Sequence, residues 1–213
     1  MKHVELVYRE LNLRNVKNVT LLVLYAIVAF YFLINGSSVF SEWNSSWTWS
    51  TIIYMLGVSI FLGIQERLPE ELESSLLHSA IGFLASFLLV TSLFLILYDA
   101  GILFTDVNPM PLKAIPATII YQLVVVVCSE EIIFRGVIFR FLYQFHWLVA
   151  VFGSAVLFSL FHLAVYEGSL GALSTAFLMG IILAWCVKRW NLGVAIGIHA
   201  AWNLFVLGVT VLA

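Results

Sequence analysis

Long uninterrupted apolar stretches constrain this chain more than any other feature of its sequence. Each is close to the length of about 20 residues that a helix needs to cross the hydrocarbon core of a bilayer. Only 10% of the 213 residues are charged, against about 25% in an ordinary soluble domain. The sequence therefore predicts an all-α, multi-pass transmembrane bundle, formed by residues 1–213 as a single integral membrane domain. The predicted spans cover about residues 19–34, 48–64, 78–98, 115–134, 147–164, 169–187 and 192–212, and an eighth short or re-entrant helix stays open.

The same composition argues against other classes of protein. Hydrophobic residues make up 62% of the chain, which is far too many for a disordered protein. A transmembrane β-barrel would show shorter segments of alternating polarity. The net charge is −2, and no basic patch suggests a nucleic-acid partner. The lipid bilayer is thus the expected environment.

The basic residues of the predicted loops indicate an orientation. Cytoplasmic loops of membrane proteins carry an excess of Lys and Arg. When alternate loops are assigned to the cytoplasm, all of the 10 Lys and Arg residues except Lys113 lie inside. This distribution supports seven spans and predicts a cytoplasmic N-terminus.

A small set of polar side chains interrupts the apolar spans of the C-terminal half. Such groups are costly at membrane depth and usually mark function. Glu131 and Arg135 are four residues apart, and so are His199 and Asn203, so the members of each pair share a helix face. Adjacent residues on a helix lie about 100° apart, so two neighbouring carboxylates can face different partners. The set consists of Glu130, Glu131, Arg135, His162, His199 and Asn203.

The predicted turn at His146 relates two of these residues in depth. Glu130 and His162 lie 16 residues before and after this turn, which corresponds to about 24 Å along each helix. An antiparallel helix pair would bring both to one level if the fourth helix continues into residues 136–144. His199 and Asn203 of the last span reach a comparable depth if the turn near Trp190 lies less deep in the cytoplasm. We therefore expect a Glu, two His and an Asn to converge in one intramembrane cavity.

Each polar residue also has a purely structural explanation. Glu131 and Arg135 could form a structural ion pair, and His162 could make a polar contact between helices. The pair His199 and Asn203 could supply interhelical hydrogen bonds. Packing alone would require all of these costly residues to be placed at matched depth, so we favour a functional site.

Three motifs appear in order along this region. Residues 130–135 read EExxxR, residues 158–162 read FxxxH, and residues 199–203 read HxxxN. Together they resemble the CPBP family of intramembrane proteases, which includes the type II CAAX prenyl endopeptidases and bacterial proteins linked to bacteriocin processing and self-immunity. The resemblance covers about residues 115–212, the expected catalytic core. The first three spans add nothing specific to it.

The resemblance implies a CAAX-protease-like endopeptidase that cleaves a membrane-associated protein or peptide. By position, it implies Glu130 as the general base that activates a water molecule. Glu131 would assist or orient this base, with Arg135 as its ion-pair partner. The short chain resembles prokaryotic members, so the expected location is a prokaryotic cell membrane.

The remaining motif residues complete the implied site. His162 would share the water or a metal, while His199 and Asn203 would polarise the scissile carbonyl or hold the oxyanion. Peptide hydrolysis needs both an activated water and such donors. Glu130, His162 and His199 could also hold zinc, with a fourth position left for water. A metal-free glutamate mechanism uses the same residues, so both forms stay open.

Two other classes of function compete with a protease. A non-catalytic membrane immunity or scaffold protein would use the same cavity only for binding. A proton-coupled transporter would use intramembrane Glu and His as a relay. The chain shows no internal repeat of the kind many transporters have, which makes the transporter the weaker of the two alternatives.

Overall fold

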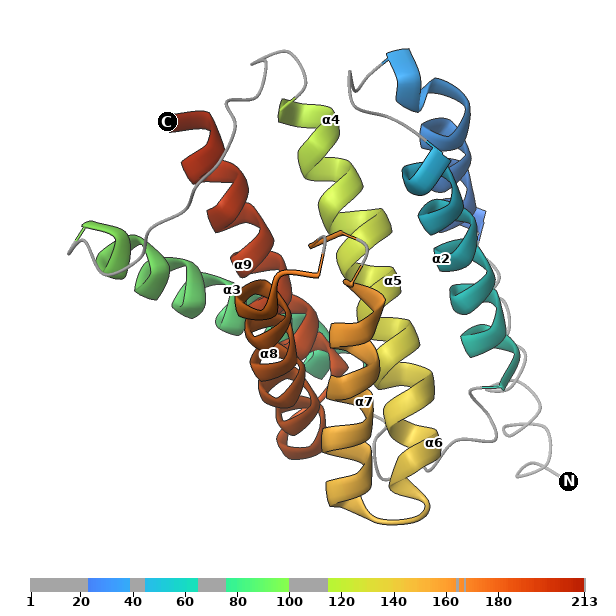
Figure 1. The fold of residues 1–213 in the computed structure, drawn as a ribbon, viewed down its shortest axis with the longest axis vertical. Coiled ribbons are helices and arrows are strands. Elements are labelled where there is room, and N and C mark those ends of the chain that lie inside the picture. Colours follow the sequence, from blue (N-terminus) through green and yellow to red (C-terminus); the bar gives the residue numbers. More distant parts are fainter. Residues whose placement is uncertain are drawn as a thin grey trace, which may run out of the picture.

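The structure is a computed structural model that describes residues 23–38, 45–64, 76–99, 115–163, 165–166 and 168–212. Within these ranges the chain forms helices joined by turns and contains no strand (Figure 1). The all-α prediction is therefore confirmed for the described part. The N-terminal segment, on which the predicted orientation depends, lies outside the described residues.

Each predicted span corresponds to a helix. The first is Val23–Ser38. The others are α2 (Ser45–Ile64), α3 (Leu76–Asp99), a long helix over Ile115–Tyr143, α7 (Trp147–Phe161), α8 (Leu170–Arg189) and α9 (Leu192–Leu212). The long helix continues beyond its predicted end at 134, as the expected meeting of Glu130 with His162 requires.

By length and apolar composition alone, two of the described helices could cross a membrane: Ile115–Tyr143 and Leu170–Arg189. The seven-span count and the orientation therefore remain predictions. Large apolar side chains face outwards on several helices. Leu89 on α3 is 72% exposed and Leu170 at the start of α8 is 81% exposed. Outward-facing apolar side chains suit a surface in contact with lipid.

The long helix changes its winding around the two glutamates. It consists of α4 (Ile115–Ile120), η4 (Tyr121–Val127), α5 (Cys128–Glu131), η5 (Ile132–Phe139) and α6 (Arg140–Tyr143). The segments η4 and η5 are π-helical and lie on either side of α5, the single turn that carries Glu130 and Glu131. Widened π turns occur frequently at functional sites. The change in helical winding thus occurs around the turn that carries the two glutamates of the EExxxR motif.

Close helix crossings hold the C-terminal helices around this turn. Helix α3 crosses α9 (Figure 1), and a Cβ at Gly197 would collide with the Phe83 carbonyl and with Ser86 Oγ. At the start of α9, Asn191 Oδ1 accepts a hydrogen bond from the Val194 amide (3.0 Å), as a capping residue does. These contacts fix the beginning of the helix that carries His199 and Asn203.

Candidate active site

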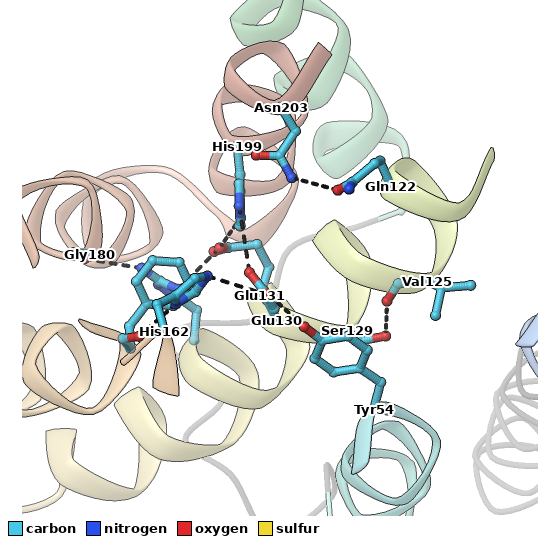
Figure 2. Close-up of polar contacts among 12 residues, drawn as sticks. Tyr54, Gln122, Val125, Ser129, Glu130, Glu131, His162, Gly180, His199 and Asn203 are labelled. Carbon is cyan, nitrogen blue, oxygen red and sulfur yellow. Dashed lines mark hydrogen bonds and ion pairs between the residues drawn. The ribbon is translucent and has the colours of Figure 1, made fainter. Parts of the chain in front are cut away.

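Three of the predicted site residues meet around one buried carboxylate (Figure 2). Glu130 on α5 is only 2% exposed. Its Oε1 lies 3.8 Å from Nε2 of His162, at the end of α7. Its Oε2 lies 3.6 Å from Nε2 of His199, on α9. The predicted meeting of a Glu and two His residues is therefore present in the structure.

The two oxygens of Glu130 have different surroundings. Oε1 accepts a hydrogen bond of 2.6 Å from the hydroxyl of Tyr54 on α2. Oε2 is buried and has no hydrogen-bond partner among the described residues. A buried carboxylate oxygen without a donor is costly, and it is a natural acceptor for a proton from a small molecule such as water.

Glu131 is held by charge. Its Oε1 contacts both Nη1 of Arg135 (3.1 Å) and Nδ1 of His199 (2.8 Å). Arg135 is fully buried, donates from Nη2 to the Gly180 carbonyl (3.3 Å) and places its guanidinium 4.4 Å from the centre of the Phe158 ring. Oε2 of Glu131 has no hydrogen-bond partner among the described residues. Glu131 thus orients His199, and Arg135 compensates the negative charge of Glu131.

Hydrogen bonds also fix which nitrogen of each imidazole faces Glu130. His162 Nδ1 lies 2.8 Å from the Phe158 carbonyl, which can only accept, so Nδ1 carries the proton. His199 Nδ1 faces the Glu131 carboxylate at 2.8 Å, and the same reasoning applies. Both Nε2 atoms therefore face Glu130. In the FxxxH motif, the backbone carbonyl of Phe158 orients His162. The side-chain ring of Phe158 packs against the guanidinium of Arg135.

Asn203 lies one turn beyond His199 on α9 (Figure 2). Its Nδ2 donates to Oε1 of Gln122 on η4 at 3.1 Å. The structure thus places Asn203 one turn from His199 on the same helix and bonds it to Gln122, a partner that the sequence did not suggest. One proton of its amide nitrogen remains for another acceptor.

Tyr166 borders the site from the turn between α7 and α8. Its ring stacks on that of His162 with 5.4 Å between the ring centres. Burial, together with the negative charge of Glu130, raises the pKa of the Tyr166 phenol. The phenol is therefore neutral at physiological pH and packs as an aromatic wall beside His162.

Two residues of the site were missed by sequence reasoning. Tyr54 and Gln122 each bond a predicted site residue across a long stretch of sequence. Tyr54 belongs to the second span, where nothing specific was expected. A single tyrosine or glutamine in an apolar span forms no sequence pattern from which its partner could be identified. The partner becomes visible only when the helices are packed together.

The residues expected as zinc ligands are Glu130, His162 and His199. Within the described residues, no group of three or more His, Cys, Asp or Glu side chains is arranged so that it could hold a metal ion. Glu130, His162 and His199 lie near one another but do not form such a site in this arrangement. The Glu130 carboxylate oxygens face the Nε2 atoms of His162 and His199. This arrangement suits proton transfer between a carboxylate, imidazoles and water.

Part of the chain is similar to a known protein family. Residues 112–205 match the family model described as type II CAAX prenyl endopeptidase Rce1-like. No curated protein and no solved structure matches the chain. The matched segment contains all three motifs and extends from just before the long helix into α9, whereas α2 with Tyr54 lies outside it. Residues 112–205 are therefore similar to the Rce1-like type II CAAX prenyl endopeptidases, which is consistent with the resemblance that the three motifs show.

Proposed function

We propose that this protein is an intramembrane endopeptidase that hydrolyses a peptide bond in a membrane-associated protein or peptide. The observation that carries the proposal is the buried Glu130 carboxylate, whose Oε2 has no hydrogen-bond partner among the described residues and which two imidazole Nε2 atoms face. The family match supports the same reaction class.

In the proposed mechanism, Glu130 is the general base. A water molecule beside Oε2 gives a proton to the carboxylate as its oxygen attacks the scissile carbonyl carbon. The new C–O bond forms a tetrahedral intermediate. The C–N bond then breaks, and Glu130 passes the proton to the leaving amine. His162, held by the Phe158 carbonyl, orients the water through Nε2. General base catalysis of this kind contributes about 10²–10⁴-fold to a rate.

The oxyanion requires hydrogen-bond donors, and α9 supplies one candidate, Asn203. His199 places Nε2 beside the water position, 3.6 Å from Glu130 Oε2, while Glu131 accepts from Nδ1 and orients the ring. Asn203 offers the amide proton that Gln122 leaves unused. Removal of one oxyanion donor typically lowers kcat by about 10²–10³-fold. Glu131 and Arg135 act indirectly, because they hold His199 in place.

The proposal is tested in cells that express wild type or Glu130→Gln at equal level. New protein termini and membrane peptides are then compared between the two. Cleavage products that vanish with Glu130→Gln support the protease and identify its substrate. The residues at the cut show whether the substrate is of the CAAX type. Identical termini from two folded proteins that share one phenotype would refute the protease and favour the non-catalytic binding protein.

A further inference from the structure

We propose that Tyr54 is a positioning residue for the catalytic carboxylate, so that the active site includes α2 as well as the matched segment 112–205. The inference rests on the proposed function of Glu130 as the base. Tyr54 donates its hydroxyl proton to Glu130 Oε1 across a sequence separation of 76 residues.

The hydrogen bond makes the two oxygens of the carboxylate unequal. At 2.6 Å, the distance is that of a charge-assisted bond from a hydroxyl to a carboxylate, about 2.5–2.7 Å. The terminal torsion of a glutamate is otherwise broad and nearly two-fold, so the two oxygens could exchange places. With Oε1 held by Tyr54, Oε2 keeps its place beside His199 Nε2. The base is thereby fixed before substrate arrives.

The packing of α2 keeps the phenol in this position. Tyr54 is 4% exposed, and its ring packs against Phe161, the residue before His162, with 6.0 Å between ring centres. One turn further along α2, a Cβ at Gly57 would collide with the side chain of Ile133. The absence of a side chain at Gly57 thus lets α2 approach the long helix closely enough for the phenol to reach Glu130.

A second tyrosine provides a matched control. The hydroxyl of Tyr25, on the helix Val23–Ser38, lies 2.7 Å from Ser129 Oγ. Tyr25 is also buried, at 9% exposure, and Ser129 directly precedes Glu130. Both tyrosines therefore tie an N-terminal helix to the same turn of the long helix, but only Tyr54 contacts the carboxylate.

The experiment compares Tyr54→Phe, Tyr25→Phe and Glu130→Gln in the full-length protein in liposomes. The probe is a quenched fluorescent peptide spanning the bond whose cleavage in cells depends on Glu130. We expect Tyr54→Phe to lower kcat by about 10- to 100-fold and to leave KM within about twofold, since it alters the base and not binding. Tyr25→Phe should keep kcat within about threefold of wild type.

Two results would overturn the inference. One is an equal loss of kcat in both Phe variants, which would make the two hydroxyls structural. The other is a wild-type kcat for Tyr54→Phe while Glu130→Gln is inactive. Activity retained by a folded Glu130→Gln would instead contradict the proposed function.

A variant that keeps the hydroxyl covers the case in which Tyr54→Phe does not fold. Incorporation of 3-fluorotyrosine at position 54 preserves the ring and hydroxyl but strengthens the phenol as a donor. A stronger bond to Oε1 makes Glu130 a weaker base, so kcat should fall while KM stays unchanged. An unchanged kcat would show that the phenol does not act on the carboxylate.

Discussion

Replacing Arg135 by Met tests the reasoning about the buried ion pair. Arg135 and Glu131 are both fully buried, and Nη1 lies 3.1 Å from Glu131 Oε1. Met fills much of the same volume without the charge. The substitution therefore leaves the Glu131 carboxylate in an apolar interior without its guanidinium, and it leaves the Gly180 carbonyl without the Nη2 donor.

The size of the effect follows from these contacts. Removal of one partner from a buried pair costs about 3–5 kcal/mol. The lost contact with the Phe158 ring, at 4.4 Å, adds about 0.5–2 kcal/mol. For a chain of this length, each kcal/mol corresponds to a shift of about 2–4 °C. We therefore expect Arg135→Met to lower Tm by at least about 7 °C.

Thermal unfolding in detergent measures this shift. A thiol-reactive fluorophore reports unfolding because Cys186 is buried and Cys128 is partly buried. The double variant Glu131→Gln/Arg135→Met removes the unpaired charge, so it should recover most of the loss. A Tm for Arg135→Met within about 2 °C of wild type, or a double variant less stable than the single one, would refute the reasoning.

Three further predictions concern the rest of the site and the fold. Asn203→Ala should lower kcat by about 10²–10³-fold and Gln122→Ala by less, because Gln122 only orients the amide; peptide cleavage in liposomes measures both, and the reverse order would contradict the assignment. Gly197→Ala should destabilise the protein by about 1–3 kcal/mol through overpacking against α3, whereas Gly208→Ala, which has open space around its Cβ, should leave Tm near wild type; equal thermal shifts would contradict this. Dialysis against 1,10-phenanthroline should leave the cleavage rate unchanged if Glu130 acts as a metal-free base; a loss that added zinc restores would make Glu130 and the histidines ligands.

Much of this arrangement could be predicted because helices have a fixed rise per residue. The apolar stretches predicted where each helix lies, although the long helix runs on from the predicted end at 134 to Tyr143. The equal spacing of Glu130 and His162 from the turn at His146 placed them at one level, and the structure brings them within 3.8 Å. The four-residue spacing of Glu131 and Arg135 correctly indicated their ion pair.

The rest depended on contacts between distant helices. Tyr54 reaches Glu130 because α2 packs closely on the long helix at Gly57, and no local pattern encodes that contact. The separation of about 100° between neighbouring residues suggested that Glu130 and Glu131 face different partners. In the structure His199 contacts both carboxylates, one with each ring nitrogen. The position of α9, fixed by its crossing with α3, determines this bridge.

The most direct test of the central claim is the cleavage rate of purified Glu130→Gln. Wild type and variant are reconstituted in liposomes with the peptide that spans the identified cut, and thermal unfolding confirms that both are folded. The proposed general base predicts a loss of at least about 10²-fold in kcat for Glu130→Gln. A folded variant that cleaves within about threefold of the wild-type rate would contradict the assignment of Glu130 as the base.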